Sequence, residues 1–308
     1  MSFVGGTRLR GAATIPAPKP VILDTDLAFD VDDVAAIAVA CALDNLGEIS
    51  LKAVITNSAN DYSAPCAQAL LNYCGKGSVP VGAYQGSAGT PSTSLYAQTV
   101  AAEFGQSGKT RANFPSADSV YRSVLAATSL ATIVSVGFLT NLAALINTAD
   151  GAALLSSQVA KMVIMGGDYP VYAAGEFNLA GNAQAASDWF SKSKIPTYLL
   201  GLTPGGLLAC GPSAGASGGT NPIKRAFDLF GVNPRSAWDP AAVLFAARGV
   251  ATGIVEGWFG GNNSVDPVTG ANTFGGNFGR NCGILNVPGN AADRNAINAV
   301  LNGLVQTF

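Results

Sequence analysis

Short apolar runs alternate along the chain with longer segments whose apolar positions recur at helical spacing. The runs at 20–24, 51–56, 131–136, 161–165 and 196–200 predict buried strands. Helices are predicted over 32–44, 64–74, 117–128, 140–148, 182–191, 222–230 and 240–248. This alternation is typical of βα units. It predicts one α/β domain of Rossmann-like topology over 20–308, with a central, mostly parallel sheet flanked by helices, after an N-terminal arm at 1–19.

Three stretches interrupt the alternation. Segments 85–116 and 203–221 are rich in Gly, Ser and Pro and predict surface loops, and 259–283 predicts a short hairpin or an irregular loop. Helix starts are predicted from capping residues: Thr140 or Asn141 for the helix at 140–148, and Asp239 for the helix at 240–248.

Composition narrows the class of protein. With 308 residues, 48% hydrophobic, the chain can bury one large core. The net charge is −2 and the basic residues are scattered, which excludes a nucleic acid polymer as partner. Five cysteines without a CxxC pair indicate reduced thiols, and no apolar run is long enough for a membrane span or signal peptide. We therefore expect a cytoplasmic protein.

One segment carries most of the candidate chemistry. Five aspartates, at positions 24, 26, 30, 32 and 33, extend from the end of the first predicted strand to the start of the first predicted helix. Like charges 4 Å apart repel by roughly 4 kcal/mol at an effective dielectric of 20, so such a cluster requires a cation, protons or strong donors. A hard divalent metal ion is the simplest answer. A plainer alternative makes Asp32 and Asp33 helix N-terminal acids, and Asp24 and Asp26 turn formers.

Four further segments fit one template in chain order. They are the strand end at 53–60, the Val136-Gly137-Phe138-Leu139-Thr140-Asn141-Leu142 turn, Met165-Gly166-Gly167 followed by Glu176-Phe177-Asn178, and Trp238-Asp239-Pro240. Combined with the aspartate cluster, they resemble the nucleoside hydrolase family, the nucleoside N-ribohydrolases. The resemblance covers roughly residues 20 to 250.

The resemblance implies a calcium-dependent glycosidase. Matched residue by residue, it implies a Ca²⁺ ion held by Asp26, Asp33, Asp239 and the main-chain carbonyl of Val136, with Asp26 also the general base on a calcium-bound water. The ribose hydroxyls would be bound by Asp32, Asn60, Glu176 and Asn178. The implied reaction releases ribose and a free base from a ribonucleoside.

Trp238 bears on the choice of base. Many family members have a histidine before the late aspartate, but this chain contains no histidine at all. A tryptophan there resembles the purine-preferring branch, in which the indole stacks on the base, and Tyr84 is a candidate for the opposite face of the base. The alternatives are packing for Trp238 and an ordinary surface position for Tyr84. Family members are commonly dimers or tetramers, so the resemblance also implies a homo-oligomer.

Departures from the family pattern leave alternatives open. The first motif has two extra residues, so that Asp30 has no role, and the usual Gly-Asn before Glu176 is missing, with Asp168, Tyr169 or Tyr172 as substitutes. A catalytically impaired protein that only binds a nucleoside or ribose is therefore an alternative. A haloacid-dehalogenase-like phosphatase also starts with a strand and D-x-D, but that family requires Thr or Val where this chain has Ala28.

Overall fold

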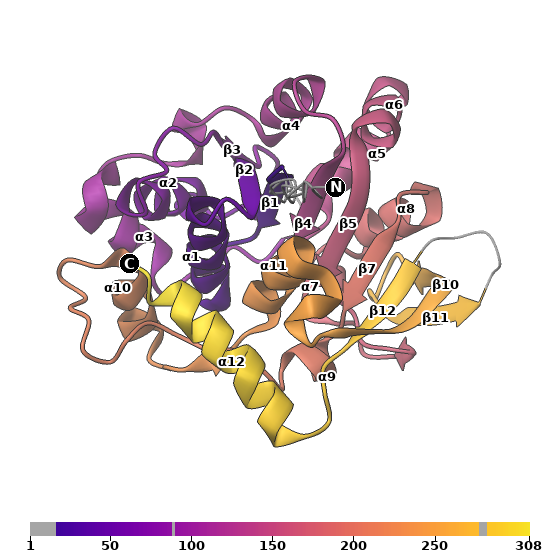
Figure 1. The fold of residues 1–308 in the computed structure, drawn as a ribbon. Helices are drawn as coiled ribbons and strands as arrows, with labels where there is room; N and C mark the ends of the chain where they lie inside the picture. Colours follow the sequence, from indigo (N-terminus) through magenta and orange to yellow (C-terminus); the bar gives the residue numbers. More distant parts are fainter. Residues whose placement is uncertain (1–16, 88–89, 277–281) are drawn as a thin grey trace, which may run out of the picture.

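The computed structural model describes residues 17–87, 90–276 and 282–308. Its centre is a ten-stranded sheet with the order β3-β2-β1-β4-β5-β7-β12-β10-β11-β6 (Figure 1). The first seven strands of this order run parallel: β3 (Val81–Ala83), β2 (Ile49–Thr56), β1 (Lys19–Thr25), β4 (Ala131–Ser135), β5 (Val159–Met165), β7 (Thr197–Leu200) and β12 (Cys282–Asn286). The predicted α/β domain with a mostly parallel sheet is confirmed. The predicted arm lies outside the described residues up to residue 16.

Alternation along each strand builds a core on both faces of the sheet. In β1, Val21 and Leu23 point to one face and Ile22 to the other, and all three are buried. The first face is covered by α1 (Asp32–Asn45), α2 (Ser63–Tyr73), α3 (Ala97–Ala101), α10 (Pro222–Phe230), α11 (Trp238–Arg248) and α12 (Ala291–Val305). The second face is covered by α4 (Ala117–Ala126), α5 (Thr140–Ile146), α6 (Ala149–Gln158) and α8 (Ala183–Lys192).

The far end of the sheet is antiparallel. Strand β10 (Val255–Val265) pairs with β12 and with β11 (Asn272–Gly276), and β11 pairs with β6 (Val171–Tyr172). The hairpin predicted within 259–283 is therefore confirmed, although it joins the main sheet and residues 277–281 are outside the described ranges. The sequence prediction omitted α6 and α12, even though Ile297, Leu301 and Leu304 are buried at helical spacing in α12.

Two predicted loops contain short elements. Segment 85–116 includes α3 and helical turns at Ala102–Gln106 and Arg111–Asn113. Segment 203–221 includes most of α9 (Leu202–Gly205) and β8 (Ala209–Cys210), which pairs with β9 (Arg235–Ser236) in a separate two-stranded sheet. Gly, Ser and Pro content therefore predicted the absence of long elements but not these short ones.

Both predicted helix caps were wrong. Helix α5 begins after Leu139, and no side chain caps it. Its first two residues are polar, but their side chains bind the chain at the end of β2 instead. Thr140 Oγ1 donates to the carbonyl of Asn57 (2.9 Å), and Asn141 Nδ2 donates to the carbonyl of Thr56 (3.1 Å). Helix α11 already begins at Trp238, so Asp239 lies inside its first turn. Tertiary partners therefore bind the Thr140 and Asn141 side chains that the sequence suggested as caps, whereas Asp239 lies too far into its helix to cap it.

The burial of the cysteines and the character of the helices are two further features of the fold. All five cysteines lie in the described ranges, each is buried, and none forms a disulfide bond. No helix within the described residues has the length and apolar character that crossing a bilayer requires.

Candidate active site

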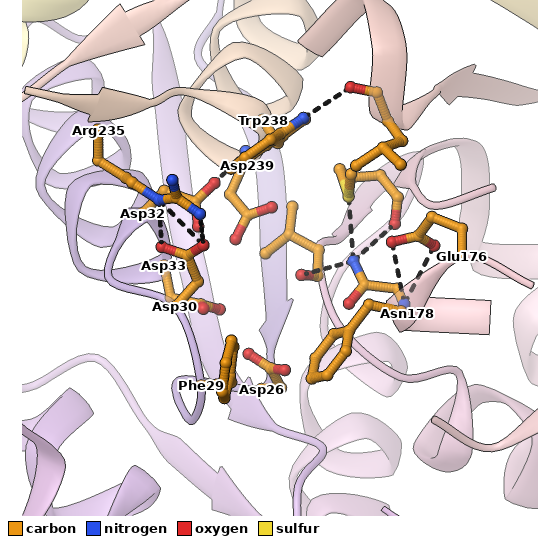
Figure 2. Close-up of a pocket in the computed structure, with 14 residues that line it drawn as sticks. Asp26, Phe29, Asp30, Asp32, Asp33, Glu176, Asn178, Arg235, Trp238 and Asp239 are labelled. Carbon is orange, nitrogen blue, oxygen red and sulfur yellow. Dashed lines mark hydrogen bonds and ion pairs between the residues drawn. The ribbon is translucent and has the colours of Figure 1, made fainter. Parts of the chain in front are cut away.

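A cavity of about 210 Å³ opens where the parallel strands end. Asp26 follows β1, Val136 follows β4, Met165 ends β5 and Leu202 follows β7, so four neighbouring strands each deliver a residue to one place. The remaining lining residues come from the loop after β1, from α1, α7 (Phe177–Ala180), β9 and α11 (Figure 2): Phe29, Asp30, Asp32, Asp33, Glu176, Phe177, Asn178, Arg235, Trp238 and Asp239. Two segments more than 200 residues apart in sequence therefore meet at this cavity.

Three carboxylates converge on one point of the cavity. Asp32, Asp33 and Asp239 each place one oxygen within 4.8 Å of the oxygens of the other two, and all three side chains are buried. Asp32 and Asp33 lie in the first turn of α1, and Asp239 lies in the first turn of α11. The backbone N–H of Asp239 donates to Asp32 Oδ2 (3.1 Å). The positive ends of two helices thus face the same cluster of acids, which partly offsets the repulsion among them.

Asp33 is held in place by the loop that precedes α1. Its Oδ1 accepts hydrogen bonds from the hydroxyl of Thr25 and from the backbone N–H of Leu27 (3.1 Å). Leu27 has φ 42°, in the left-handed region that non-glycine residues rarely adopt, and its side chain is fully buried. The strained turn lets the chain reverse between β1 and α1 while Asp26 and Asp33 stay at the cavity.

Burial raises the pKa of each acid in the cluster. The pKa of Asp26 rises to about 7, first because of desolvation, with a hydrogen bond to Asp33 opposing the shift and the charge of Asp32 adding to it. Desolvation, followed by repulsion from neighbouring aspartates, also raises the pKa values of Asp32, Asp33 and Asp239. Metal-free protein therefore keeps protons on this cluster near neutral pH, and a cation would displace them.

A second layer of polar side chains supports the site from behind. The Asp24 carboxylate is fully buried and accepts hydrogen bonds from Tyr121 Oη (2.6 Å), Asn141 Nδ2 (3.2 Å) and Asn57 Nδ2. Desolvation raises the pKa of Asp24 to about 6, although these three donors oppose the rise. Because Asp24, Asn57 and Asn141 follow or end different strands, this network joins the β1, β2 and β4 ends beneath the cavity.

Gly137 allows the β4 end to approach the β1 end. A Cβ atom at this position would lie 2.6 Å from the backbone nitrogen of Asp26 and 2.6 Å from Asn57 Oδ1. No side chain fits there without displacing Asp26. The glycine therefore keeps the Val136 carbonyl and Asp26 next to each other.

Helix α7 brings Glu176 and Asn178 to the opposite wall (Figure 2). The Glu176 carboxylate caps this short helix, accepting from the N–H groups of Asn178 (3.0 Å) and Gly167 (2.8 Å). Asn178 Nδ2 donates to the carbonyls of Val136 (3.3 Å) and Met165 (3.2 Å). These contacts fix both side chains against the ends of β4 and β5.

Trp238 forms the upper wall in Figure 2. Its Nε1 donates to the carbonyl of Leu202 (2.8 Å), and a Cβ on Gly205 would come within 2.4 Å of the indole Cδ1. The hydrogen bond and the close approach of α9 fix the plane of the ring. Trp238 lines the cavity, as the predicted base-stacking role requires, while part of its surface also packs against the core.

The sequence prediction missed Arg235 and Phe29, and gave Asp30 no role. Arg235 Nε donates to Asp30 Oδ1 (3.0 Å), and Nη2 donates to Oδ2, closing an ion pair between β9 and the loop before α1. Phe29 is 54% exposed and lies 5.6 Å from Phe177, between ring centroids. No sequence motif marks Arg235, but Asp30 was visible as the surplus acid of the first cluster.

Two predicted substrate-binding residues lie outside the cavity lining. Asn60 is engaged elsewhere, with Nδ2 donating to the Ser92 carbonyl and Oδ1 accepting from the Tyr62 N–H. Tyr84 follows β3 at the edge of the sheet and its carbonyl accepts from Arg111 (3.1 Å). The candidate substitutes for the missing Gly-Asn also lie outside the lining: Asp168, Tyr169 and Tyr172. Their roles toward a substrate stay predictions.

The donor set fits a hard cation. The converging atoms are carboxylate oxygens, with the Val136 carbonyl in the same cavity, and oxygen-only sites of this kind suit Ca²⁺ or Mg²⁺ better than zinc. The predicted ligands Asp26, Asp33 and Asp239 all line this cavity. The three carboxylates whose oxygens lie within 4.8 Å of one another are instead Asp32, Asp33 and Asp239. Asp26 lies beside them and is hydrogen-bonded to Asp33.

Comparison with known proteins agrees with the cavity chemistry. The profile described as inosine-uridine preferring nucleoside hydrolase matches residues 21–209, and no curated protein matches the sequence.

Several solved structures share the fold, among them two nucleoside hydrolases and an effector protein. A nucleoside hydrolase from Bacillus anthracis has a TM-score of 0.69 at 16% identity, covering 92% of this chain and 99% of that one. A purine-preferring ribonucleoside hydrolase from Gardnerella vaginalis has a TM-score of 0.66 at 19% identity, covering 94% and 100%. The type III effector XopQ, complexed with adenosine diphosphate ribose, has a TM-score of 0.68 at 18% identity, covering 94% of each chain. At such low identities these likenesses show the fold alone.

Proposed function

Because the chain belongs to the inosine-uridine preferring nucleoside hydrolase family, whose members are metal-dependent N-glycosyl hydrolases, we propose that it hydrolyses purine ribonucleosides to ribose and free base with the help of Ca²⁺. The observation that carries this proposal is the buried triad of Asp32, Asp33 and Asp239, within 4.8 Å of one another in a cavity that Asp26 and Trp238 also line. Family membership leaves no support for the phosphatase alternative.

The metal would be held by Asp26, Asp33, Asp239 and the Val136 carbonyl, with Asp32 close enough to share in the site. When bound, a divalent cation supplies a positive anchor for vicinal hydroxyls and makes a neighbouring water more acidic. Asp32, Glu176 and Asn178 then hold ribose hydroxyls at the cavity wall, and Asn60 is a further predicted contact. Burying five acidic lining residues without a cation is costly, which is why ion binding fits this cavity.

Asp26 acts as the general base. It takes a proton from the attacking water as the water oxygen bonds to C1′ and the C1′–N bond breaks, and the bonding electrons leave with the base. The base then takes its proton from solvent, since the chain has no histidine to supply one. Trp238 lies at the cavity wall with its ring plane fixed, in a position to stack on a purine.

The test is turnover by the variant Asp26→Asn at saturating calcium. Loss of a general base lowers kcat by about 10² to 10⁴, measured as release of hypoxanthine from inosine, while the thermal unfolding curve keeps its cooperative shape. The matched control is Asp61→Asn, since the Asp61 side chain is 58% exposed in a surface ion pair and should leave kcat as in wild type. Near-normal turnover by Asp26→Asn would remove Asp26 from the mechanism.

A second candidate is binding without turnover. The observation that favours it is the shared fold of an effector that was solved with adenosine diphosphate ribose bound. Both candidates predict a ligand-binding cavity and a calcium-stabilised fold, so only product release separates them. The homo-oligomeric state and the cytoplasmic location stay predictions.

A further inference from the structure

Arg235 is the one basic residue among those that line the cavity in the described part of the chain. The other charged lining residues are six acids. Asp30 is paired with Arg235, and the proposed cation and the ribose hydroxyls would occupy the other five. Neither the metal site nor the general base uses Arg235. Its presence at the cavity wall therefore needs a separate explanation.

The structure holds the guanidinium group rigidly. The Asp30 carboxylate accepts hydrogen bonds from Nε and Nη2 of Arg235 in a bidentate ion pair. The guanidinium carbon lies 5.5 Å from the ring centroid of Phe230 and 5.0 Å from that of Trp238, so both aromatic faces pack against it. An arginine fixed by an ion pair and by stacking loses little further freedom when it binds a planar ligand.

The ion pair presents a donor, not an acceptor, to the cavity. Asp30 Oδ1 accepts from the Val31 N–H (2.7 Å) and from Arg235 Nε, and Oδ2 accepts from Nε (3.1 Å) and Nη2. A carboxylate has about four acceptor sites, so these contacts use its capacity. Arg235 Nη1 donates no hydrogen bond to any of the described residues, and its N–H groups are left for a ligand.

Arg235 also lies next to Trp238, the proposed stacking partner of the base. The proposed function anchors the sugar at the cluster formed by Asp32, Asp33 and Asp239. Trp238, the proposed stacking partner, lies between Arg235 and Asp239 in sequence and contacts the guanidinium. A ribose held at the acids would then bring its base next to Trp238 and Arg235, which Figure 2 shows among the side chains that line the cavity.

We propose that Arg235 recognises the base by donating from Nη1 and from the second N–H of Nη2 to O6 and N7 of a 6-oxopurine, which makes inosine and guanosine better substrates than adenosine. This inference rests on the proposed function and names its substrate class. Arginine donors match the O6 and N7 acceptors of guanine and hypoxanthine, whereas adenine carries an amino donor at position 6. In the complex with adenosine, the amino group and the guanidinium are both donors and would face each other with no acceptor between them.

The experiment measures kcat/KM for inosine and adenosine in wild type and in Arg235→Gln, at saturating calcium. We expect wild type to favour inosine by about tenfold or more, and Arg235→Gln to lose most of that ratio. The ratio compares two substrates in one protein, so a general loss of activity cancels. The matched control is Arg122→Gln, whose arginine pairs with Asp118 and Asp150 on α4 and α6 and should keep the wild-type ratio.

The outcomes separate this inference from the proposed function. Equal kcat/KM values in wild type, or an unchanged ratio in Arg235→Gln, would overturn the role of Arg235 and leave nucleoside hydrolysis standing. If wild type hydrolyses no nucleoside, the proposed function fails, and the Kd values of inosine and adenosine measured by calorimetry decide the inference instead. Tighter inosine binding that Arg235→Gln abolishes would support it, and any other pair of Kd values would overturn it.

Discussion

Substituting alanine for Gly137 tests the close approach on which the site depends. The added Cβ would lie 2.6 Å from the backbone nitrogen of Asp26 and 2.8 Å from its Cβ. Ordinary contact begins near 3.4 Å, so the β1 and β4 ends must separate by about 0.8 Å. Both neighbours are backbone or near-backbone atoms of a buried residue, which cannot rotate away as the end of a flexible side chain does.

The expected cost follows from that displacement. Overpacking of a buried position lowers the free energy of unfolding by about 1–3 kcal/mol, which corresponds to a fall in Tm of about 2–6 °C for a domain of this size. A displacement approaching 1 Å at a catalytic group costs on the order of 10²-fold in rate. A 10²-fold loss is about 2.7 kcal/mol, so we expect Gly137→Ala to lower kcat/KM for inosine by a free energy similar to the one it removes from stability.

Thermal and denaturant unfolding with calcium present, together with kcat/KM for inosine, measure both effects. Gly303→Ala is the matched control, because Gly303 is exposed in α12 and a Cβ there meets nothing within 4 Å. That variant should gain about 0.4–1 kcal/mol in the free energy of unfolding and keep wild-type activity. Wild-type unfolding and wild-type kcat/KM in Gly137→Ala would refute the argued proximity of Asp26 to the β4 end.

Three further predictions address the cluster, its support and the base. Chelation should lower the Tm, and the metal-free protein should lose stability as pH rises from about 4 to 7, because the folded state keeps protons on Asp24 (pKa about 6) and Asp26 (pKa about 7) that the unfolded state has released. Urea titrations at several pH values check this, and a stability that rises over that range would contradict it. Tyr121→Phe should lower the free energy of unfolding by about 1–3 kcal/mol, because the buried Asp24 carboxylate loses its 2.6 Å donor; denaturant midpoints measure the loss, and an unchanged midpoint would show that the network is redundant. Trp238→Ala should reduce kcat/KM for purine nucleosides more than for nitrophenyl riboside, whose leaving group needs no protonation, by an amount near the 1–3 kcal/mol typical of aromatic stacking on a base; equal losses for the two substrates would reject stacking.

Much of the fold was visible in the sequence because its signals are local. The parallel strands β1, β2, β4, β5 and β7 are short runs of buried apolar residues, and their helices have apolar positions at helical spacing. The antiparallel end was predicted only as a hairpin. Its strands carry Gly, Asn and Thr, and they are strands because they extend an existing sheet edge rather than by their own propensity.

The candidate site likewise combines features that the sequence predicted with features that depend on how the chain folds. The sequence alone placed the acids after β1 at the carboxyl edge of a sheet, because parallel strands all end there. Asp239, which lies in the first turn of α11, was joined to them only through the family resemblance. Tertiary structure decided which of them meet: Asp32 joins Asp33 and Asp239, while Asp24 turns away to Tyr121, Asn57 and Asn141. It also brought Arg235 to Asp30 across 205 positions of sequence. No local pattern encodes such a pairing, because it depends on how two helices pack against one sheet, whereas strand ends and helix periods are set by neighbouring residues.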